Sequence, residues 1–295
     1  METLFELNPS QKDKIAKKSA YVSIAVNVFL TIFQVVIGII SGASSLVADG
    51  IHSLSDLISD FLVLIARNYS QKDADEDHPY GHYRYENAAS FFIGLILIFV
   101  ACGMTYSAIL KLEDHDSLQK VSSIALWIAC LTLVSKELLF RYMLKEAEKI
   151  KSSLLIANAW HARSDAASSL VAALGILGNL SGHYFLDPVA AIIVALVIGK
   201  MGITFTWSSL HDLMDRAADQ ETIEKVKKTI SETPGVLGFH DMKTRKIGDF
   251  IIVDVHLEIN GQLTVEEGHQ IAVETRKRVM AQHEVLNLMT HVDPV

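Results

Sequence analysis

Two pairs of side chains that can bind a metal ion lie roughly a hundred residues apart in this 295-residue chain, each within an apolar segment. The first pair is His52 and Asp56, and the second is His161 and Asp165. Residues four apart stack on one face of a helix with Cβ atoms about 5 to 6 Å apart, so each pair can supply two ligands to one ion. Two imidazoles and two carboxylates suit a four-coordinate divalent cation such as zinc. The spacing therefore predicts one metal site shared by two helices.

Both segments are long enough to cross a bilayer, which makes their charged side chains informative. An ionisable residue near the centre of a spanning helix costs about 2.5 to 3.5 kcal/mol on insertion scales, so it normally faces a cavity and has a function. A catalytic zinc keeps one coordination position open for water, whereas four protein ligands close the shell. The chain also lacks the His-Glu-x-x-His motif that a zinc hydrolase would carry. These features favour transport of the ion over catalysis.

Half of the residues are hydrophobic, yet the last third of the chain is ordinarily polar. This composition predicts an N-terminal segment over 1–19, a membrane domain over 20–208 and a soluble domain over 209–295. The membrane domain has six apolar segments, each near the roughly 20 residues that a spanning helix needs. They cover residues 20–41, 45–67, 88–111, 121–143, 154–178 and 186–207. The second and fifth carry the two metal-binding pairs.

Basic residues are concentrated in the loops that join the apolar segments on one side of the membrane. They precede the first segment and recur between the second and third and between the fourth and fifth, as Lys12, Lys14, Lys17, Lys18, Arg67, Lys72, Arg84, Arg141, Lys145, Lys149 and Lys151. Residues 41–45 and 179–186 contain neither Lys nor Arg, and the loop after the third segment has only Lys111 and Lys120. Because cytoplasmic loops collect basic residues, both termini are expected in the cytoplasm. The N-terminal segment lacks the apolar core and cleavage site of a secretory signal, so we expect it to be retained.

Net charge and cysteine content exclude other classes. The formal net charge of -8 gives no basic footprint for a nucleic acid. Cys102 and Cys130 both lie in apolar segments and are most simply small core residues. No disulfide framework is expected.

Four further charges lie inside the apolar segments. Asp49 and Asp60 extend the polar stripe of His52 and Asp56 along the same helix, although Asp60 can also lie simply at its cytoplasmic end. Lys136 and Glu137 in the fourth segment can snorkel, form structural ion pairs or line the path of the cation. Structural pairing is the favoured interpretation, and neither is counted as a ligand.

The loop over 71–86 places Asp75, Asp77, His78 and His82 within eight positions, next to the helix breakers Pro79 and Gly81. A run of this kind is commonly a solvated acidic loop. Two histidines four apart beside carboxylates can also hold a second, weaker metal at the cytoplasmic mouth. Both interpretations stay open on the sequence alone.

The soluble domain has the order of a small α+β sandwich, α-β-β-α-β. An amphipathic helix is predicted over 219–233, capped by Asp219, and a second helix follows Thr264 in a capping box with Glu267. Two strands joined at Gly248 and Asp249 separate the helices, and a third strand closes the domain at 285–295.

This domain has ligands of its own. Alternation along VDVHLEI places His256 on the polar face of its strand, and His291 shares a face with Asp293. With His240 and His269 they can form a surface metal cluster, whereas each histidine alone is more simply an ordinary surface residue. Only the fold can bring them together.

Taken as a set, the motifs closely resemble those of the cation diffusion facilitator family, in particular its bacterial zinc/proton antiporters, also described as ferrous-iron efflux pumps. The resemblance covers nearly the whole chain and rests on SLVADGIHSLSD, DHPYGHYRYE, SKELLFRY, AWHARSD, and VLGFHD, VHLEI, EEGHQI and HVDP in the last domain. It implies six membrane helices, a cytoplasmic domain like a copper metallochaperone, and a homodimer in the inner membrane of a bacterium.

The resemblance also implies roles for individual residues. The transport site falls on His52, Asp56, His161 and Asp165, and a site in the intracellular loop on Asp75, His78 and His82. A cytoplasmic two-metal site would use His240, His256, His269 and His291, with Asp293 bridging. Arg84 and Asp215 match an interlocking charge pair at the family's dimer contact. Some bacterial relatives have Asp where this chain has His52, which shifts the expected selectivity toward zinc and cadmium, while iron and cobalt also accept imidazole with carboxylate.

Metal binding requires neutral imidazole and ionised carboxylate, so protons must leave as the cation arrives. The sequence therefore predicts a zinc efflux transporter that exchanges the metal for protons across the bilayer, with zinc also regulating through the last domain. The rival interpretation is a membrane-bound metal sensor or scaffold without transport, which has little reason to keep four ligands at membrane depth.

Overall fold

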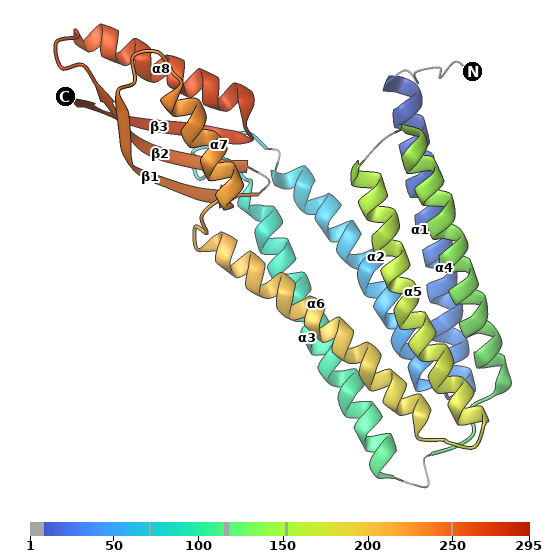
Figure 1. Ribbon diagram of the computed structural model, residues 1–295. Coiled ribbons are helices and arrows are strands. Elements are labelled where there is room, and N and C mark those ends of the chain that lie inside the picture. Colours follow the sequence, from blue (N-terminus) through green and yellow to red (C-terminus); the bar gives the residue numbers. More distant parts are fainter. Residues whose placement is uncertain (1–8, 71, 115–117, 151–152, 249) are drawn as a thin grey trace. The chain divides into compact units, whose positions relative to one another are not determined.

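The computed structural model describes residues 9–70, 72–114, 118–150, 153–248 and 250–295; within them, a few side chains, including those of Asp60 and His161, are outside the description. The chain forms eight helices and three strands in these ranges (Figure 1). The helices that precede the first strand are α1 (Pro9–Ser41), α2 (Ser44–Ser70), α3 (Arg84–Glu113), α4 (Ser123–Ile150), α5 (Ser153–Leu180), α6 (Leu186–Leu213) and α7 (Gln220–Ser231). The remaining elements are β1 (Gly238–Ile247), β2 (Phe250–Ile259), α8 (Val265–Gln282) and β3 (Val285–Pro294).

The expected fold class is confirmed: a helical membrane domain is followed by an α+β domain. Four helices of the described residues are long and apolar enough to cross a membrane, over Lys17–Ser41, Arg84–Glu113, Ser123–Lys149 and Leu186–Leu213. The other two long helices, α2 and α5, contain 27 and 28 residues, or about 40 Å of helix each. Both carry polar side chains of the predicted metal site. Contacts divide the chain into two compact units, Met1–Phe61 with Leu95–Ile203, and Leu62–Gly94 with Thr204–Val295.

In the first unit, α4 packs along both α1 and α5 (Figure 1). Small residues permit the close approach: Ala125 and Ala129 of α4 and Ala173 of α5 are buried in one cluster with Leu46 and Ile176. Between α1 and α2 the chain turns at Gly42, whose φ of 73° favours glycine. This packing brings α2 and α5, which carry the predicted ligands, into one bundle.

The start of α2 is fixed by a carboxylate from α6. Asp187 is buried, and it accepts hydrogen bonds from the backbone N–H groups of Ser44 and Ser45 at 2.7 and 3.1 Å and from the Ser45 hydroxyl at 2.5 Å. A carboxylate at a helix N-terminus satisfies unpaired N–H groups and interacts favourably with the helix dipole. Asp187 therefore sets the position at which the ligand-bearing helix begins.

The second unit contains the predicted α-β-β-α-β order. The sheet order is β1-β2-β3, with β2 antiparallel to β1 and parallel to β3. Val253, Val255 and Leu257 of β2 are buried against α7 and α8, as the alternation along this strand predicts. The Asp219 cap and the Thr264–Glu267 capping box are both present. Gly248 adopts a φ of 59° at the hairpin, while Asp249 lies outside the described residues.

Candidate metal-binding sites

Three of the four predicted membrane ligands converge in the first unit. His52, Asp56 and Asp165 each place a ligand atom within 4.8 Å of the others. His52 is only 3 % exposed, and its Nδ1 lies 3.7 Å from Asp56 Oδ2 one turn further along α2. The side chain of His161 lies outside the described residues, but α5 is helical through this position, one turn before Asp165. A cation between α2 and α5 would thus meet one imidazole and two carboxylates, with a second imidazole one turn away on α5.

A cavity of about 230 Å³ adjoins this cluster. Its lining includes His52, Asp165 and Ser168 together with apolar side chains of α6, such as Val194 and Val197. A site walled by apolar groups strengthens the attraction between carboxylates and a cation, because water screens it less. The geometry suits binding of a dehydrated divalent ion.

Three of the four further charges, Asp49, Lys136 and Glu137, form ion pairs, and the side chain of Asp60 lies outside the description. Lys136 lies 3.8 Å from Asp49, and Glu137 pairs with Arg141 at 2.8 Å and with Arg163 at 3.7 Å. The interpretation of Lys136 and Glu137 as structural partners agrees with these contacts. Asp49 is a member of a buried network that is described below.

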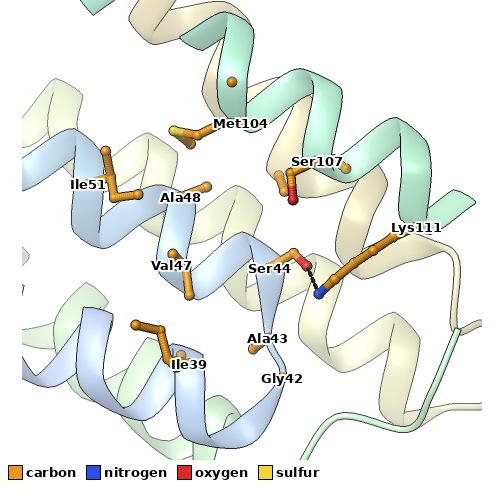
Figure 2. A pocket seen from close by; sticks show the side chains of 14 residues that line it. Ile39, Gly42, Ala43, Ser44, Val47, Ala48, Ile51, Met104, Ser107 and Lys111 are labelled. Atoms are coloured by element: carbon orange, nitrogen blue, oxygen red, sulfur yellow. Dashed lines mark hydrogen bonds between the residues drawn. The ribbon is translucent and has the colours of Figure 1, made fainter. Parts of the chain in front are cut away.

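A larger cavity, of about 410 Å³, follows the first turns of α2 (Figure 2). Lys111 of α3 reaches into it and donates a 2.6 Å hydrogen bond to the hydroxyl of Ser44, while Ile39, Val47 and Met104 form apolar walls. The described residues around this cavity include no His, Cys or carboxylate. The larger cavity therefore offers no ligand set for a cation, whereas the smaller cavity is lined by side chains that can bind one.

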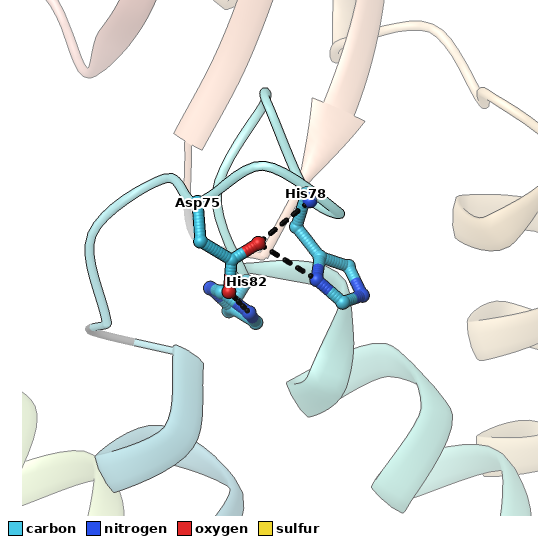
Figure 3. A group of neighbouring side chains, drawn as sticks. All are labelled: Asp75, His78 and His82. Atoms are coloured by element: carbon cyan, nitrogen blue, oxygen red, sulfur yellow. Dashed lines mark hydrogen bonds and ion pairs between the residues drawn. The ribbon is translucent and has the colours of Figure 1, made fainter.

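In the second unit, the loop before α3 forms a compact cluster around one carboxylate (Figure 3). Asp75 Oδ1 accepts the backbone N–H of His78 at 2.7 Å and lies 3.1 Å from His78 Nδ1, and Asp75 Oδ2 lies 3.3 Å from His82 Nε2. Desolvation acts to raise the pKa of Asp75, but the hydrogen bonds from His78 outweigh it and hold this pKa below the ordinary value. His82 is buried, whereas His78 is exposed. An ionised carboxylate between two imidazoles is a suitable cradle for a divalent cation.

A third cluster lies across the sheet. His240, His256 and His291 occupy paired positions on β1, β2 and β3, and Asp293 reaches all three. Its Oδ2 is 2.9 Å from His256 Nδ1 and 3.4 Å from His240 Nε2, and its Oδ1 is 3.3 Å from His291 Nε2. The hydrogen bond from His256 is the main reason that the pKa of Asp293 lies below its ordinary value, and desolvation opposes it. Asp293 can therefore bridge two ions held by these histidines.

Comparison with known families decides the class. The model of the cation efflux transmembrane domain matches residues 20–214, and that of the cation efflux protein cytoplasmic domain matches residues 218–295. The chain belongs to the cation diffusion facilitator family. It is a multi-pass membrane transporter of divalent metal cations with a cytoplasmic C-terminal domain, and not an enzyme.

Individual facilitators are similar over almost the whole chain. An uncharacterised transporter of Methanocaldococcus jannaschii is 37 % identical, covering 95 % of this chain and 98 % of its own length. The manganese efflux system protein MneP of Bacillus subtilis is 32 % identical over 97 % and 98 % of the two chains. Metal tolerance protein 2 of rice, Oryza sativa subsp. japonica, is 32 % identical over 91 % of this chain and 76 % of its own length. These relatives support metal efflux as the class of function without assigning one ion.

One predicted residue of the facilitator's cytoplasmic site lies elsewhere in the single chain. His269 is exposed on α8 and belongs to none of the ligand groups found among the described residues. Asp241, by contrast, groups with His240 and His256 and was missed. Its φ of 47° lies in the left-handed region, at the irregularity between His240 and Lys243 where β1 departs from regular pairing. The adjacent His-Asp dipeptide was the available signal, but regular strand alternation would have pointed Asp241 away from His240.

The charge pair expected from the resemblance forms within the chain. Arg84 forms an ion pair with Asp215 and donates a 3.0 Å hydrogen bond to the carbonyl of Leu213. Asp215 itself has a φ of 61°, a conformation that Asp tolerates better than most residues. The pair joins the start of α3 to the segment that follows α6.

Proposed function

We propose that this facilitator exports zinc from the cytoplasm in exchange for protons, and that cadmium, iron(II) and cobalt(II) are also accepted. The observation that carries the proposal is the convergence of His52, Asp56 and Asp165 in a largely buried site, with His161 one turn from Asp165 on the same helix. Mixed imidazole and carboxylate ligands suit borderline cations better than they suit calcium or magnesium.

Proton exchange follows from the chemistry of these ligands. An imidazole must be neutral to bind the metal, so the histidines of the site are deprotonated when the metal binds, and protons that arrive from the other side compete for the same nitrogens. Rocking of the bundle between inward and outward openings would connect the site to each side in turn. The metal then loads from the cytoplasm, and external protons displace it.

We further propose a division of labour along the chain. Residues 20–208 carry the transport pathway, and residues 209–295 sense cytoplasmic metal, with 1–19 also cytoplasmic and the protein in the inner membrane of a bacterium. We call the group of His240, His256, His291 and Asp293 the His240–Asp293 cluster. In a homodimer, His269 of one subunit would reach this cluster of the other subunit. An ion shared across that joint would stabilise one relative position of the two domains by its differential affinity. The loop cluster of Asp75, His78 and His82 is assigned as a third metal site, on the cytoplasmic side.

The direct test is flux in proteoliposomes that contain the full-length protein and a zinc-sensitive dye. Zinc uptake should rise when an outward proton gradient is imposed, and each transported ion should be accompanied by a change in internal pH. Binding of zinc without any flux under either gradient would support the sensor alternative instead.

Manganese is the competing substrate, because two similar proteins are named manganese efflux system proteins. Transport measured with both ions present shows whether zinc or manganese is the preferred substrate. Under the proposal, zinc suppresses manganese transport at a lower concentration than manganese suppresses zinc transport. The reverse order would assign manganese efflux to this site.

Replacing His52 with Asp is expected to broaden the accepted ions. The substitution exchanges a nitrogen ligand for an oxygen ligand, which hard cations such as manganese prefer. We expect the zinc-over-manganese preference to fall by about tenfold or more, equivalent to about 1.4 kcal/mol, as measured by competitive transport. A matched control is His183→Asp, since His183 is exposed in the turn after α5. An unchanged preference in the His52 variant would count against selection by this ligand.

Replacing Asp293 with Ala is expected to lower zinc affinity at the cytoplasmic cluster by about tenfold or more, because one carboxylate contacts all three histidines. In the unaltered protein, affinity at this cluster should fall as the pH is lowered, because protons compete with the metal for the ligand atoms. Asp293 itself should stay ionised over this range, because its pKa is depressed. Chelator competition on the full-length protein measures both effects. Asp254→Ala on the neighbouring strand β2 is the control, and an equal loss there would remove the special role of Asp293.

A further inference from the structure

Three helices place polar side chains on a single buried carboxylate of α2 in the first unit. Asp49 of α2 is only 1 % exposed. The hydroxyls of Ser168 and Ser169 of α5 each donate a hydrogen bond of 2.6 Å to it, and the Gln34 amide of α1 donates another. The ammonium of Lys136 from α4 lies 3.8 Å away. A carboxylate buried to this degree requires such donors, because an uncompensated charge in an apolar interior is costly.

Lys136 extends the network to the metal site on both sides. It is 4 % exposed, and its ammonium donates hydrogen bonds to the Ser53 hydroxyl at 3.2 Å and to the backbone carbonyl of Asp165 at 3.3 Å. Ser53 directly follows His52, and Asp165 is itself one of the converging ligands. One ammonium group therefore holds the ligand-bearing turns of α2 and α5 at a fixed separation.

The charges of the two groups also balance. Asp49 and Lys136 cancel each other, so the net charge presented to a dication comes from Asp56 and Asp165. Removal of one partner would leave a buried charge about one helical turn from the ligands, and it would also release the cross-link between the two helices. Removal of both partners would restore the charge balance while the cross-link stayed broken.

We propose that Asp49 and Lys136 act as a positioning pair that sets the separation of α2 and α5 across the metal site, and thereby determines which divalent cation the site accepts. This inference rests on the transport function proposed above. Neither residue is a ligand in this scheme. Both act by fixing the distances between the proposed ligands His52, Asp56 and Asp165.

The test compares four full-length proteins in proteoliposomes: unaltered, Asp49→Asn, Lys136→Met and the double variant. Initial transport rates are measured over a concentration series of zinc and of manganese. We expect the half-saturating zinc concentration to rise at least tenfold in each single variant and the zinc-to-manganese preference to change at least threefold. The double variant should recover part of the zinc affinity, because the charges balance, but it should keep the altered preference, because the cross-link is missing.

Two further variants separate positioning from loss of fold. Ser169→Ala removes one donor to Asp49 without changing a charge, and it should shift the preference in the same direction but less. Lys111→Met is the matched control, since Lys111 also donates to a serine of α2 but lies at the larger cavity. It should transport like the unaltered protein.

The outcomes are distinct. Single variants with an unaltered preference, whether their rates fall or not, would overturn the positioning role and leave the pair as a structural contact. An unaltered protein that transports neither ion would instead refute the proposed function. Thermal unfolding in detergent, measured in the same preparations, reports whether each variant is folded.

Discussion

Replacing Asp165 with Ala is expected to reduce zinc transport at least about a hundredfold, to the level of liposomes without protein. Asp165 is the proposed ligand of α5 whose carboxylate lies within 4.8 Å of the ligand atoms of His52 and Asp56 of α2. Its removal takes away a ligand atom and one of the two negative charges that balance a dication in a cavity with apolar walls. Disturbance of groups that merely support metal ligands already costs about 10- to 100-fold in metal affinity, so loss of a ligand should cost more. Dye-based flux with a proton gradient measures the effect.

The matched control for this variant is Asp114→Ala, which removes an exposed carboxylate just after α3. Its transport should stay within about twofold of the unaltered protein. In the Asp165 variant, zinc binding at the His240–Asp293 cluster should persist, because that cluster lies in the other compact unit. Flux that survives the Asp165 substitution would make the membrane site dispensable, and loss of cytoplasmic binding as well would indicate a folding defect.

The sequence was sufficient where periodicity and local chemistry determine structure. The spacing of His52 and Asp56 predicts a shared helix face, and the structure places their ligand atoms close together. In the soluble domain, the cap at Asp219 and the box at Thr264 are interactions between residues three apart, so they can be recognised from the sequence. The burial of alternate residues along β2 follows from the period of a strand.

Contacts between distant residues could not be predicted in the same way. Asp49 and Lys136 are far apart in the chain, and hydropathy alone does not predict that these two charged side chains form a pair. The bridging position of Asp293 depends on β3 lying parallel to β2 with His256 opposite His291, a register that short-range patterns do not specify. The separation of His269 from the sheet cluster has the same origin, since α8 covers the sheet through its apolar face and leaves this histidine exposed.

A second large effect is expected where α5 and α6 pack backbone to backbone, at Gly175. A Cβ added there would lie 2.4 Å from the Cβ of Ala190 and 3.0 Å from the carbonyl oxygen of Leu186. Neither atom can rotate away, so Gly175→Ala must push the helices apart. We expect a loss of about 1 to 3 kcal/mol in stability, typical of an overpacked core. Thermal unfolding in detergent measures it.

Two other glycines provide graded controls. At Gly178 the nearest contact of an added Cβ is the tip of the Leu186 side chain, at 2.3 Å, which can move more easily than backbone. At Gly103 on α3 an added Cβ meets nothing within 4 Å. The expected order of destabilisation is therefore Gly175→Ala, then Gly178→Ala, then Gly103→Ala with almost no effect. An equal loss in all three would mean that the close approach of α5 and α6 does not control stability here, since alanine by itself favours a helix more than glycine does.

The same substitution should affect transport, because the contact lies between two anchors of the metal site. On one side, α5 carries Asp165, and on the other, the first turn of α6 carries Asp187, whose carboxylate caps the helix that carries His52 and Asp56. Moving α6 away from α5 therefore changes the position of α2 relative to Asp165. Gly175→Ala should raise the half-saturating zinc concentration even at temperatures where the protein remains folded, whereas Gly103→Ala should leave it unchanged. A Gly175 variant that is less stable but binds and transports zinc normally when folded would show that α2 and α5 hold the ligands without help from α6.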